Sequence, residues 1–343
     1  MSVKRIAFCN YYKELNKNDF MFQCKNSGIG DDLLTPLIEL KKYANAQGIE
    51  IASVDLMDVS TADAVVFIDM PEKDNPYLTL ARKSGKRLYL LALESKLIRK
   101  ENYSSENHAI FNKIFTYDDS LIDNDKFYKI NYSFLIPASI PTDLSKKEKL
   151  CTMIAGNKAV LHPQELYSKR IEAIRWFERN QPQDFDLYGV GWDEGTLGCL
   201  FPRAITRRWE WLKRLGRPAF PSWRGRVVRK RDVMGLYRFA FCFENIMDVP
   251  GYITEKAFDA FFSGTVPVYR GADNVTDHIP SECFIDLRNF SSYEALYTYM
   301  KSLSEKDYAG YLDAIESFLE SERSYPFSCE CFAKTIVNGI ASE

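Results

Sequence analysis

The sequence predicts an α/β protein of two domains, each built on a mainly parallel β-sheet with helices on both faces. Short apolar runs alternate with helical patterns through the first part of the chain, and the same alternation resumes after residue 150. Alternating strands and helices are typical of covered parallel sheets. A proline-containing segment at 137–141 and a charged stretch at 145–149 separate the two parts. A chain of 343 residues can form two such domains, which we place at 1–145 and 150–343.

The elements expected in the first domain follow from the spacing of apolar residues. Apolar runs predict strands over residues 3–9, 49–54, 64–68 and 87–93. Helical spacing predicts an amphipathic helix over residues 32–46 and a second helix over residues 77–83. In an open α/β sheet, ligands bind beyond the carboxyl ends of the strands, so residues that directly follow these runs are candidates for a site.

The second domain shows the same pattern. Strands are expected over residues 151–155, 185–190, 236–243 and 265–269, with a helix over residues 163–180. Between the last two strands the chain crosses the Pro250-Gly251 loop and enters a helical pattern that begins near Glu255 and ends at Gly264. This strand–loop–helix–strand unit is the most informative part of the sequence.

Lys256 lies where that helix begins, a position that normally disfavours a cation. The free N–H groups of a helix N-terminus carry positive partial charge and attract anions. One interpretation is that Glu255 pairs with Lys256 and offsets the cost. The other is that Lys256 and the helix N-terminus together bind a diphosphate group.

Residues 243–271, FENIMDVPGYITEKAFDAFFSGTVPVYRG, resemble the signature of the α1,3/1,4-fucosyltransferase family. The family's glutamate and asparagine fall on Glu244 and Asn245, its tyrosine on Tyr252, and its Glu-Lys pair on Glu255 and Lys256. The resemblance extends through residues 284–286 and 326–340, where family members also close their second domain. It implies the GT-B glycosyltransferase fold, in which two Rossmann-type domains face each other across a cleft.

The resemblance also implies a donor site for a GDP-sugar in the second domain. Its expected contacts are Asn157, Arg170, Glu244, Asn245, Tyr252, Glu255 and Lys256. Arg170 and Lys256 would hold the diphosphate and stabilise the charge that grows on it as the glycosidic bond breaks. The alternatives are that Arg170 is a solvated surface group, with Lys169 or Arg175 in its place, and that Glu244 only supports the Pro250-Gly251 loop.

Glu94 is the candidate general base. Inverting glycosyl transfer needs a carboxylate that removes the proton of the acceptor hydroxyl as it attacks. Glu94 follows the apolar run 87–93 and matches the family's glutamate, with the family's downstream FN…TY segment at residues 111–117. Lys96 replaces the family's proline, and a glutamate at a strand end is otherwise an ordinary solvated loop residue.

No essential metal is expected, although a non-essential divalent cation remains possible. The strings Asp184-Phe185-Asp186 and Asp123-Asn124-Asp125 spell a motif that binds metal in other glycosyltransferases, but such short strings arise often by chance. The eight cysteines are scattered without a CxxC pair, and the three histidines lie far apart. We therefore expect reduced thiols and no zinc site.

Residues 197–231 form a basic, aromatic insertion relative to the resembled family. Its single acid is Glu210 and its aromatic residues include Trp209, Trp211, Phe220 and Trp223. Its basic residues are Arg203, Arg207, Arg208, Lys213, Arg214, Arg217, Arg224, Arg226, Arg229, Lys230 and Arg231. Such a composition suits contact with an anionic membrane surface. The alternative is a solvated loop whose arginines cover the donor site, and nothing else supports nucleic-acid binding.

The sequence therefore predicts an inverting transferase that moves L-fucose from GDP-fucose to a hydroxyl of a glycan acceptor, through an α1,3 or α1,4 linkage. The expected acceptor is a bacterial lipopolysaccharide or another surface glycan. The chain shows no apolar span of bilayer length, so we expect a cytoplasmic protein with peripheral membrane contact through residues 197–231. The alternatives are another GDP-sugar as donor, or a non-catalytic GDP- or glycan-binding protein.

Overall fold

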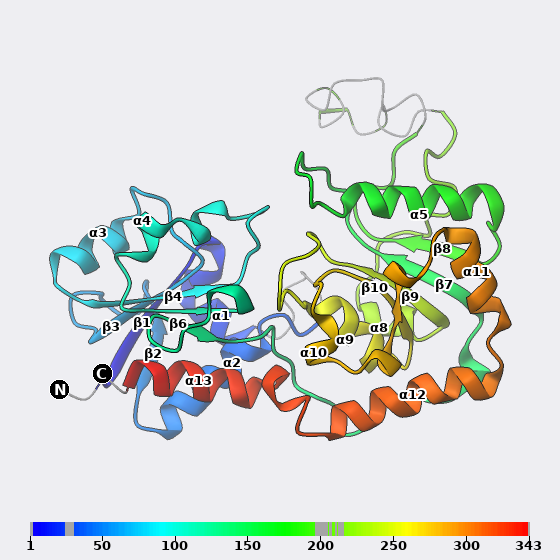
Figure 1. The fold of residues 1–343 in the computed structure, drawn as a ribbon. Helices are drawn as coiled ribbons and strands as arrows, with labels where there is room; N and C mark the ends of the chain where they lie inside the picture. The colour runs from blue at the N-terminus through cyan, green and yellow to red at the C-terminus, as the bar shows by residue number, and fades with distance from the viewer. Residues whose placement is uncertain are drawn as a thin grey trace.

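The computed structural model of the protein contains two parallel β-sheets, which lie in separate lobes of the molecule (Figure 1). It describes residues 3–24, 31–195 and 216–341, together with residues 205, 208, 209 and 211. Every strand pair in both sheets is parallel. The α/β class expected from the alternation of strands and helices is therefore confirmed.

The first sheet has six strands in the order β2-β1-β3-β4-β5-β6. Its strands are β1 (Arg5–Asn10), β2 (Glu50–Ser53), β3 (Ala64–Ile68), β4 (Arg87–Ala92), β5 (Lys113–Thr116) and β6 (Phe127–Lys129). Its helices are α1 (Phe20–Gln23), α2 (Thr35–Ala46), α3 (Pro76–Lys83) and α4 (Ser105–His108). The four strands predicted from apolar runs are β1 to β4, whereas β5 and β6 are too short and too polar at their ends to be recognised that way.

Both faces of the first sheet are buried, as a covered parallel sheet requires. Alternate residues of each strand enter different cores. On β1, for example, Ile6 and Phe8 pack toward one side, and Ala7 and Cys9 pack toward the other. The strand sequences are consequently apolar throughout instead of alternating with polar residues.

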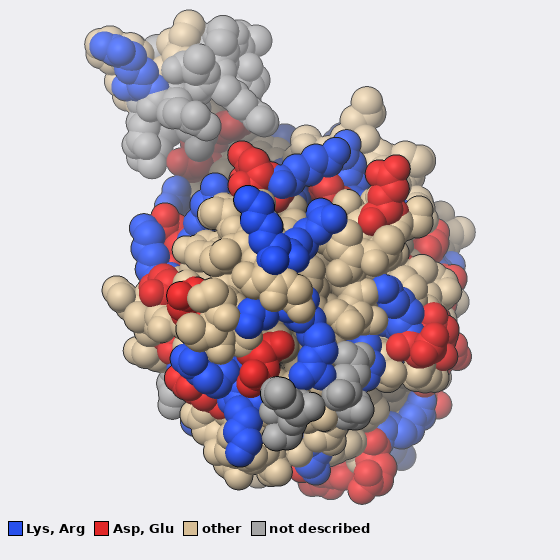
Figure 2. Space-filling model, turned by 90° about the vertical axis from the view of Figure 1, so that its left-hand side faces the viewer, with Lys and Arg blue, Asp and Glu red and all other residues tan. Residues whose placement is uncertain are grey.

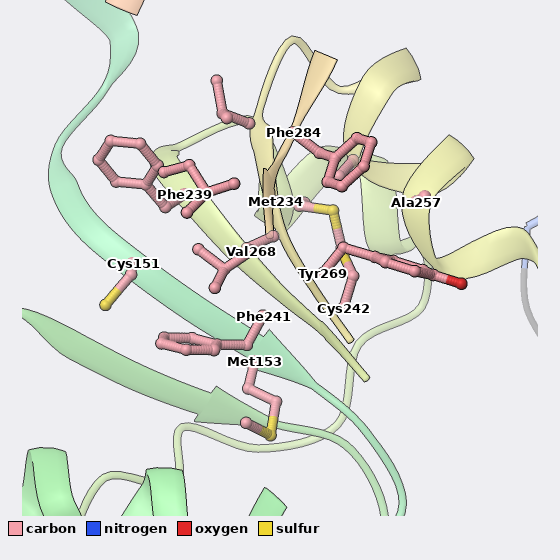
Figure 3. Packing of buried hydrophobic residues seen from close by; sticks show 14 of the residues in the cluster. Cys151, Met153, Met234, Phe239, Phe241, Cys242, Ala257, Val268, Tyr269 and Phe284 are labelled. Atoms are coloured by element: carbon pink, nitrogen blue, oxygen red, sulfur yellow. The ribbon is translucent and has the colours of Figure 1, made fainter. Parts of the chain in front are cut away.

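The second sheet has five strands in the order β11-β10-β9-β7-β8. Its strands are β7 (Lys149–Ile154), β8 (Phe185–Tyr188), β9 (Tyr237–Phe243), β10 (Val266–Arg270) and β11 (Ile285–Asp286). Its helices are α5 (Tyr167–Asn180), α8 (Lys230–Met234), α9 (Glu255–Phe262), α10 (Val275–His278), α11 (Tyr293–Ser302) and α12 (Glu305–Glu320). Figure 3 shows Met153 of β7 and Phe241 of β9 packed together, with Val268 of β10 beside them.

The two sheets share one topology. In each sheet the first strand along the chain lies between the second and the third, so the strand order reverses at that point, which we call the switch point of the sheet. In open α/β sheets this reversal opens a crevice at the carboxyl ends of the strands, where ligands bind. The fold therefore provides two equivalent candidate sites, one beyond β1 and β3 and the other beyond β7 and β9.

We expected residues 326–343 to close the second domain, but the C-terminal segment does not do so. Helix α13 (Cys329–Ala341) instead lies against α2 of the first domain (Figure 1). Its apolar residues, among them Phe332, Ile336 and Ile340, are buried in the same core as Phe8. The physical reason is that α13 covers a face of the first sheet that α2 alone leaves open.

Candidate active site

A cavity of about 380 Å³ lies at the carboxyl ends of β7 and β9, at the switch point of the second sheet. The ends of both strands line it, together with α5, the N-terminus of α9 and the segment 226–230. Its charged lining residues are Lys158, Arg170, Arg226, Lys230, Lys256, Glu255 and Asp259. We call it the cationic cavity, because five cations against two carboxylates make it attractive to anions.

Lys256 at the start of α9 has two carboxylate partners. Its Nζ lies 3.1 Å from Glu244 Oε2 and 3.5 Å from Glu255 Oε1. Burial alone would lower the pKa of Lys256, but these two carboxylates raise it, so the side chain stays charged. The pairing with Glu255 anticipated from the sequence is thus present, and Lys256 also lines the cationic cavity.

Glu244 supports the N-terminus of α9 from the end of β9. Its side chain is completely buried and accepts hydrogen bonds from the backbone N–H of Thr254 at 2.8 Å and from the Thr254 hydroxyl at 2.7 Å. It is not among the lining residues of the cationic cavity. Glu244 therefore has a supporting role at the helix start rather than at the Pro250-Gly251 loop, and a direct contact of Glu244 with the donor stays a prediction.

Arg170 is a buried residue of α5 and not a solvated surface group, with only 5% of its surface exposed. Its Nη2 donates to the carbonyl oxygens of Phe243 and Glu244 at 2.8 and 2.9 Å, and to Asn245 Oδ1 at 3.0 Å. Both Arg170 and Asn245 line the cationic cavity. Arg170 therefore fixes the end of β9 at the cavity and adds a charge to its wall.

Like Glu244, two further expected donor contacts, Asn157 and Tyr252, lie outside the lining of the cationic cavity. The Asn157 side chain donates to the carbonyl oxygen of Gly191 at 2.9 Å, and its backbone N–H donates to Val190. It thereby holds the loop after β8, whose Val190 lines the cavity. Tyr252 is buried against Tyr117 of the first domain, with ring centroids 4.9 Å apart. It belongs to an aromatic contact between the domains.

A second cavity, of about 180 Å³, lies at the switch point of the first sheet. The residues after β1, β3 and β4 line it, together with α2, the segment 131–134 and Phe332 of α13. Its charged lining residues are Asp31, Asp32, Asp69, Glu94 and Glu255. We call it the acidic cavity, because no lysine or arginine of the described ranges lines it. It also carries apolar and aromatic walls, including Tyr12 and Tyr132.

Glu94 lies in the acidic cavity, directly after β4 as expected. Its Oε1 accepts a hydrogen bond from the Tyr12 hydroxyl at 2.9 Å, and its backbone N–H donates to Asp69 Oδ1 at 2.8 Å. Glu255 lines both cavities, so the cationic and acidic cavities adjoin at the start of α9. A carboxylate thus lies on one side of this junction and a cluster of cations on the other.

The described end of the basic insertion belongs to the site and to the contact between the domains. Arg226 and Lys230 line the cationic cavity, and Lys230 Nζ lies 2.7 Å from Asp259 Oδ2 and 3.6 Å from Glu255 Oε1. The backbone N–H groups of Lys230 and Arg231 donate to Asp31 of the first domain, at 3.1 and 3.0 Å. The interpretation of a loop that covers the donor site therefore fits these residues better than membrane contact does.

The rest of the insertion divides into described and undescribed residues. Arg208, Trp209 and Trp211 are exposed, whereas Arg203, Arg207, Lys213, Arg214 and Glu210 lie outside the described residues. Sequence reasoning placed Arg226 and Lys230 in the insertion but missed them as lining residues. It also missed Tyr12 and Asp69 beside Glu94. Their positions directly after apolar runs were the available signal for Tyr12 and Asp69.

Both Asp-x-Asp strings have structural partners. Asp186 is bonded to Lys149 and Arg224, each at 2.6 Å, and Asp123 Oδ1 accepts three backbone N–H groups of its own turn. Within the described ranges no three His, Cys, Asp or Glu side chains come together as a metal site. The seven cysteines of these ranges are free, and Cys199 lies outside them. No described helix is long and apolar enough to cross a membrane.

The outer face of the first domain carries charges of both signs. On the first-domain face shown in Figure 2, Lys and Arg side chains lie among Asp and Glu side chains.

Two parallel sheets, each with a cavity at its switch point, define the GT-B class of glycosyltransferase folds. A solved α1,3-fucosyltransferase has this fold with a TM-score of 0.58 at 15% identity, over 99% of this chain and 90% of that one. HepE of Anabaena, solved with UDP and glucose, gives 0.57 at 11% identity, over 99% and 100%.

The second half of the chain is similar to proteins of known family. Residues 219–325 match the model of glycosyltransferase family 10 (fucosyltransferase), C-terminal domain, which confirms the resemblance that the signature indicated. An α-(1,3)-fucosyltransferase of Helicobacter pylori is 35% identical over 89 residues, 26% of this chain and 18% of that protein. An α-(1,4)-fucosyltransferase of Arabidopsis thaliana is 43% identical over 72 residues, 21% and 18%. The chain thus spans less than a fifth of these two relatives.

Proposed function

We propose that the protein is an inverting glycosyltransferase that moves L-fucose from GDP-fucose to a hydroxyl group of a glycan. The observation that carries the proposal is the junction of the two cavities at Glu255, with cations gathered in one and Glu94 in the other. Fucose as the sugar is supported by the family 10 match over residues 219–325 and by the relatives named above.

The cationic cavity suits the diphosphate of a nucleotide sugar. Arg170 and Lys256 lie in its wall, and Arg226 and Lys230 add further positive charge. When the bond between the sugar and the β-phosphate breaks, negative charge grows on the leaving diphosphate, and fixed cations stabilise that charge most strongly in the transition state. Asn245 and Glu255 line the same cavity and are the proposed contacts for the hydroxyl groups of the donor.

Glu94 supplies the base. Its carboxylate accepts the proton of the acceptor hydroxyl while the oxygen attacks the anomeric carbon from the side opposite the diphosphate. The new glycosidic bond forms as the bond to the phosphate breaks, so the anomeric configuration inverts and GDP leaves. Because no cation among the described residues lines the acidic cavity, an uncharged sugar hydroxyl fits it better than an anionic group does.

The donor can be tested directly. Purified protein is incubated with GDP-fucose, GDP-mannose or UDP-sugars, with and without a chelator, and release of the nucleotide is followed. We expect GDP to be released from GDP-fucose selectively and without a metal requirement. Release from another GDP-sugar would overturn fucose as the sugar but retain the site, and loss of release with chelator would overturn metal independence.

We also propose that the acceptor is a bacterial surface glycan such as lipopolysaccharide, joined through an α1,3 or α1,4 linkage, and that the protein works in the cytoplasm near the membrane. The support is the basic and aromatic composition of residues 197–231 and the exposure of Trp209 and Trp211. Co-sedimentation with anionic vesicles checks it. Deletion of residues 203–214 should abolish sedimentation, and unchanged sedimentation would contradict membrane contact through this segment.

A second candidate is a protein that binds GDP or a glycan without catalysis. It would bind the nucleotide at Lys256, which lines the cationic cavity, but Glu94 would be unable to act as a base. A Glu94→Gln variant distinguishes the two. An enzyme loses turnover and keeps its affinity for GDP. A binding protein shows no turnover in either form.

A further inference from the structure

The peptide group of Glu94 is held on both sides by side chains from other parts of the first domain. Asp69 Oδ1 accepts hydrogen bonds from the backbone N–H groups of Leu93 and Glu94, at 2.9 and 2.8 Å. The Asn102 side chain donates to the carbonyl oxygen of Glu94 at 3.2 Å and to Asp69 Oδ1 at 2.7 Å. The backbone that carries the Glu94 side chain is therefore fixed by groups that contact it directly.

Asp69 occupies an unfavourable position to make these contacts. It is buried, and its φ of 58° lies in the left-handed region, which costs a residue with a side chain about 1 kcal/mol. Burial also raises the pKa of its carboxyl group to about 6. Residues stay in such conformations only where the surroundings determine them, and they gather at functional sites.

Tyr12 holds the carboxylate itself. Its hydroxyl donates to Glu94 Oε1 at 2.9 Å, and its ring lines the acidic cavity. The backbone N–H of Tyr12 donates to the side chain of Asn10, the last residue of β1, at 2.9 Å. The ends of β1, β3 and β4 thus supply Tyr12, Asp69 and Glu94 to one place, the switch point of the sheet.

Three further tyrosines of the first domain connect this arrangement to the second domain. The Tyr103 hydroxyl donates to the carbonyl oxygen of Glu94 at 3.2 Å and is also hydrogen-bonded to the Tyr117 hydroxyl. The Tyr132 hydroxyl donates to the carbonyl oxygen of Leu93. The rings of Tyr117 and Tyr132 lie 4.9 and 6.0 Å from that of Tyr252. The signature tyrosine of the second domain therefore packs on the residues that hold Glu94.

We propose that Asp69 and Tyr12 are positioning residues for Glu94, Asp69 through the backbone and Tyr12 through the carboxylate. The inference rests on the proposed role of Glu94 as the base. It predicts that these side chains act on the rate of transfer and not on the binding of the donor, because both lie in the acidic cavity and neither lines the cationic one.

The test compares Asp69→Ala, Asp69→Asn and Tyr12→Phe in the full chain. GDP release from GDP-fucose, with water as acceptor, gives kcat and KM, and calorimetry gives the affinity for GDP. Asp69→Ala should lower kcat by about 10- to 100-fold, since a shift of about 1 Å in a reacting group can cost 10²-fold. Asp69→Asn should restore most of it, because its amide oxygen can accept the same N–H groups. Tyr12→Phe should lower kcat by about tenfold.

The matched control is Asp63→Ala. Asp63 Oδ2 accepts the backbone N–H groups of Lys4 and Arg5 at 2.8 and 2.9 Å, the same kind of contact at the opposite, amino-terminal ends of the strands. It should lower stability without changing kcat. Hydrogen exchange gives a readout that needs no turnover: Asp69→Ala should speed exchange in residues 91–97, and Asp63→Ala should not.

The outcomes separate the inference from the function on which it rests. If Glu94→Gln keeps its turnover, or if the unaltered protein releases GDP from no donor, the proposed role of Glu94 fails and the inference fails with it. If Glu94→Gln is inactive while Asp69→Ala keeps full kcat, only the inference is overturned. Equal losses in Asp69→Ala and Asp69→Asn, or a loss of GDP affinity in Tyr12→Phe, would also overturn it.

Discussion

The two cavities occupy equivalent places in sheets of the same strand order, yet they differ in charge. Two carboxylic acids show the difference. Burial and the nearby charge of Glu94 raise the pKa of Asp69 to about 6, although hydrogen-bond donors oppose the shift. Burial would also raise the pKa of Glu255, but Lys256 and Lys230 hold it well below its usual range.

The topology provides the crevices, and the side chains add their charge. Strand order places a crevice at each switch point, and this is the same in both domains. The cations of the second crevice come from α5, α9, the segment 226–230 and Lys158, whereas the first crevice receives no cation from the described residues that line it. A leaving diphosphate needs the cationic environment of the second crevice, and a carboxylate base needs the acidic environment of the first. The proposed chemistry is therefore divided between the two cavities: the cationic cavity holds the leaving diphosphate and the acidic cavity holds the base.

The largest effect should follow from removing the base. Glu94→Gln keeps the size and the hydrogen bond from Tyr12, but it cannot take a proton from the acceptor. We expect kcat for GDP release to fall by about 10³-fold, with the affinity for GDP unchanged. Stopped or continuous nucleotide assays and calorimetry check this. A parallel loss of GDP affinity would mean that the acidic cavity also contributes to donor binding, and the division would not hold.

A smaller effect should follow from removing a cation of the other cavity. Lys256→Met should weaken the binding of GDP by about 100-fold, the expected value of a charged contact to phosphate. The free energy of unfolding should also fall, because the buried carboxylate of Glu244 loses its cation. Binding is therefore measured by calorimetry well below the unfolding temperature.

The control for Lys256→Met is Lys169→Met on α5. Lys169 is paired with Glu172 on the exposed side of the helix, and 51% of its side chain is accessible. The Lys169→Met substitution removes the same charge next to Arg170 without changing a residue of the cationic cavity. We expect less than a twofold change in the affinity for GDP. Equal losses in both variants would show that the overall charge, and not the cavity, determines binding.

Much of this arrangement could be predicted from local sequence. The strands β1 to β4 and β7 to β10 follow from apolar runs, because a parallel strand buried on both faces is apolar throughout. Glu94 and Lys256 lie at strand and helix ends, but the resemblance to the family signature was needed to assign the roles of Glu94, Arg170 and Lys256. These features depend on contacts close in the chain or on the shared topology.

The remaining features depend on contacts between distant residues. Asp31 binds the N–H groups of Lys230 and Arg231, which lie 199 and 200 residues further along the chain. Helix α13 covers the first sheet although it follows the second domain in sequence. Tyr252 matches a donor-binding position of the family signature, but its ring packs on Tyr117 of the other domain. No local pattern distinguishes such residues from surface or core residues.

The alignment of the two cavities can be disturbed at Gly251. Its φ is 77°, and a Cβ atom there would lie 2.3 Å from the carbonyl oxygen of Tyr117 and 2.7 Å from Asp119 of the first domain. Gly251→Ala should therefore destabilise the protein by about 3 kcal/mol, from backbone strain and overpacking. It should also lower kcat more than the affinity for GDP, since it moves the domains but leaves each cavity intact.

The control for Gly251→Ala is Gly310→Ala in α12. A Cβ atom at Gly310 meets nothing within 4 Å, so alanine should stabilise the helix by about 1 kcal/mol. Urea unfolding and GDP titration measure both variants. A Gly251→Ala protein with normal stability and kcat would show that the loop does not set the contact between the domains.

The smallest effect should be a change in how stability depends on pH. The pKa of Asp69 is about 6 in the folded protein, above its usual value of 3.8. Its contribution to stability is therefore fully present below pH 3.8 and is lost as pH rises through about 6. Asparagine does not titrate, so between pH 4 and pH 7 the free energy of unfolding of Asp69→Asn should gain about 2 kcal/mol relative to the unaltered protein.

The relative stability of Asp63→Asn should change with pH in the opposite direction. Hydrogen bonds from the Lys4 and Arg5 amides hold the pKa of Asp63 below its usual value, although burial opposes them. Its contribution is present above pH 3.8 and is lost as pH falls, so Asp63→Asn should lose relative stability as pH rises from 3 to 5. Urea unfolding at several pH values measures both. If the relative stability of both variants changed in the same direction with pH, the cost of burying the Asp69 carboxylate beside Glu94 would not be the cause of the change. The acidic cavity would then owe its charge to other groups.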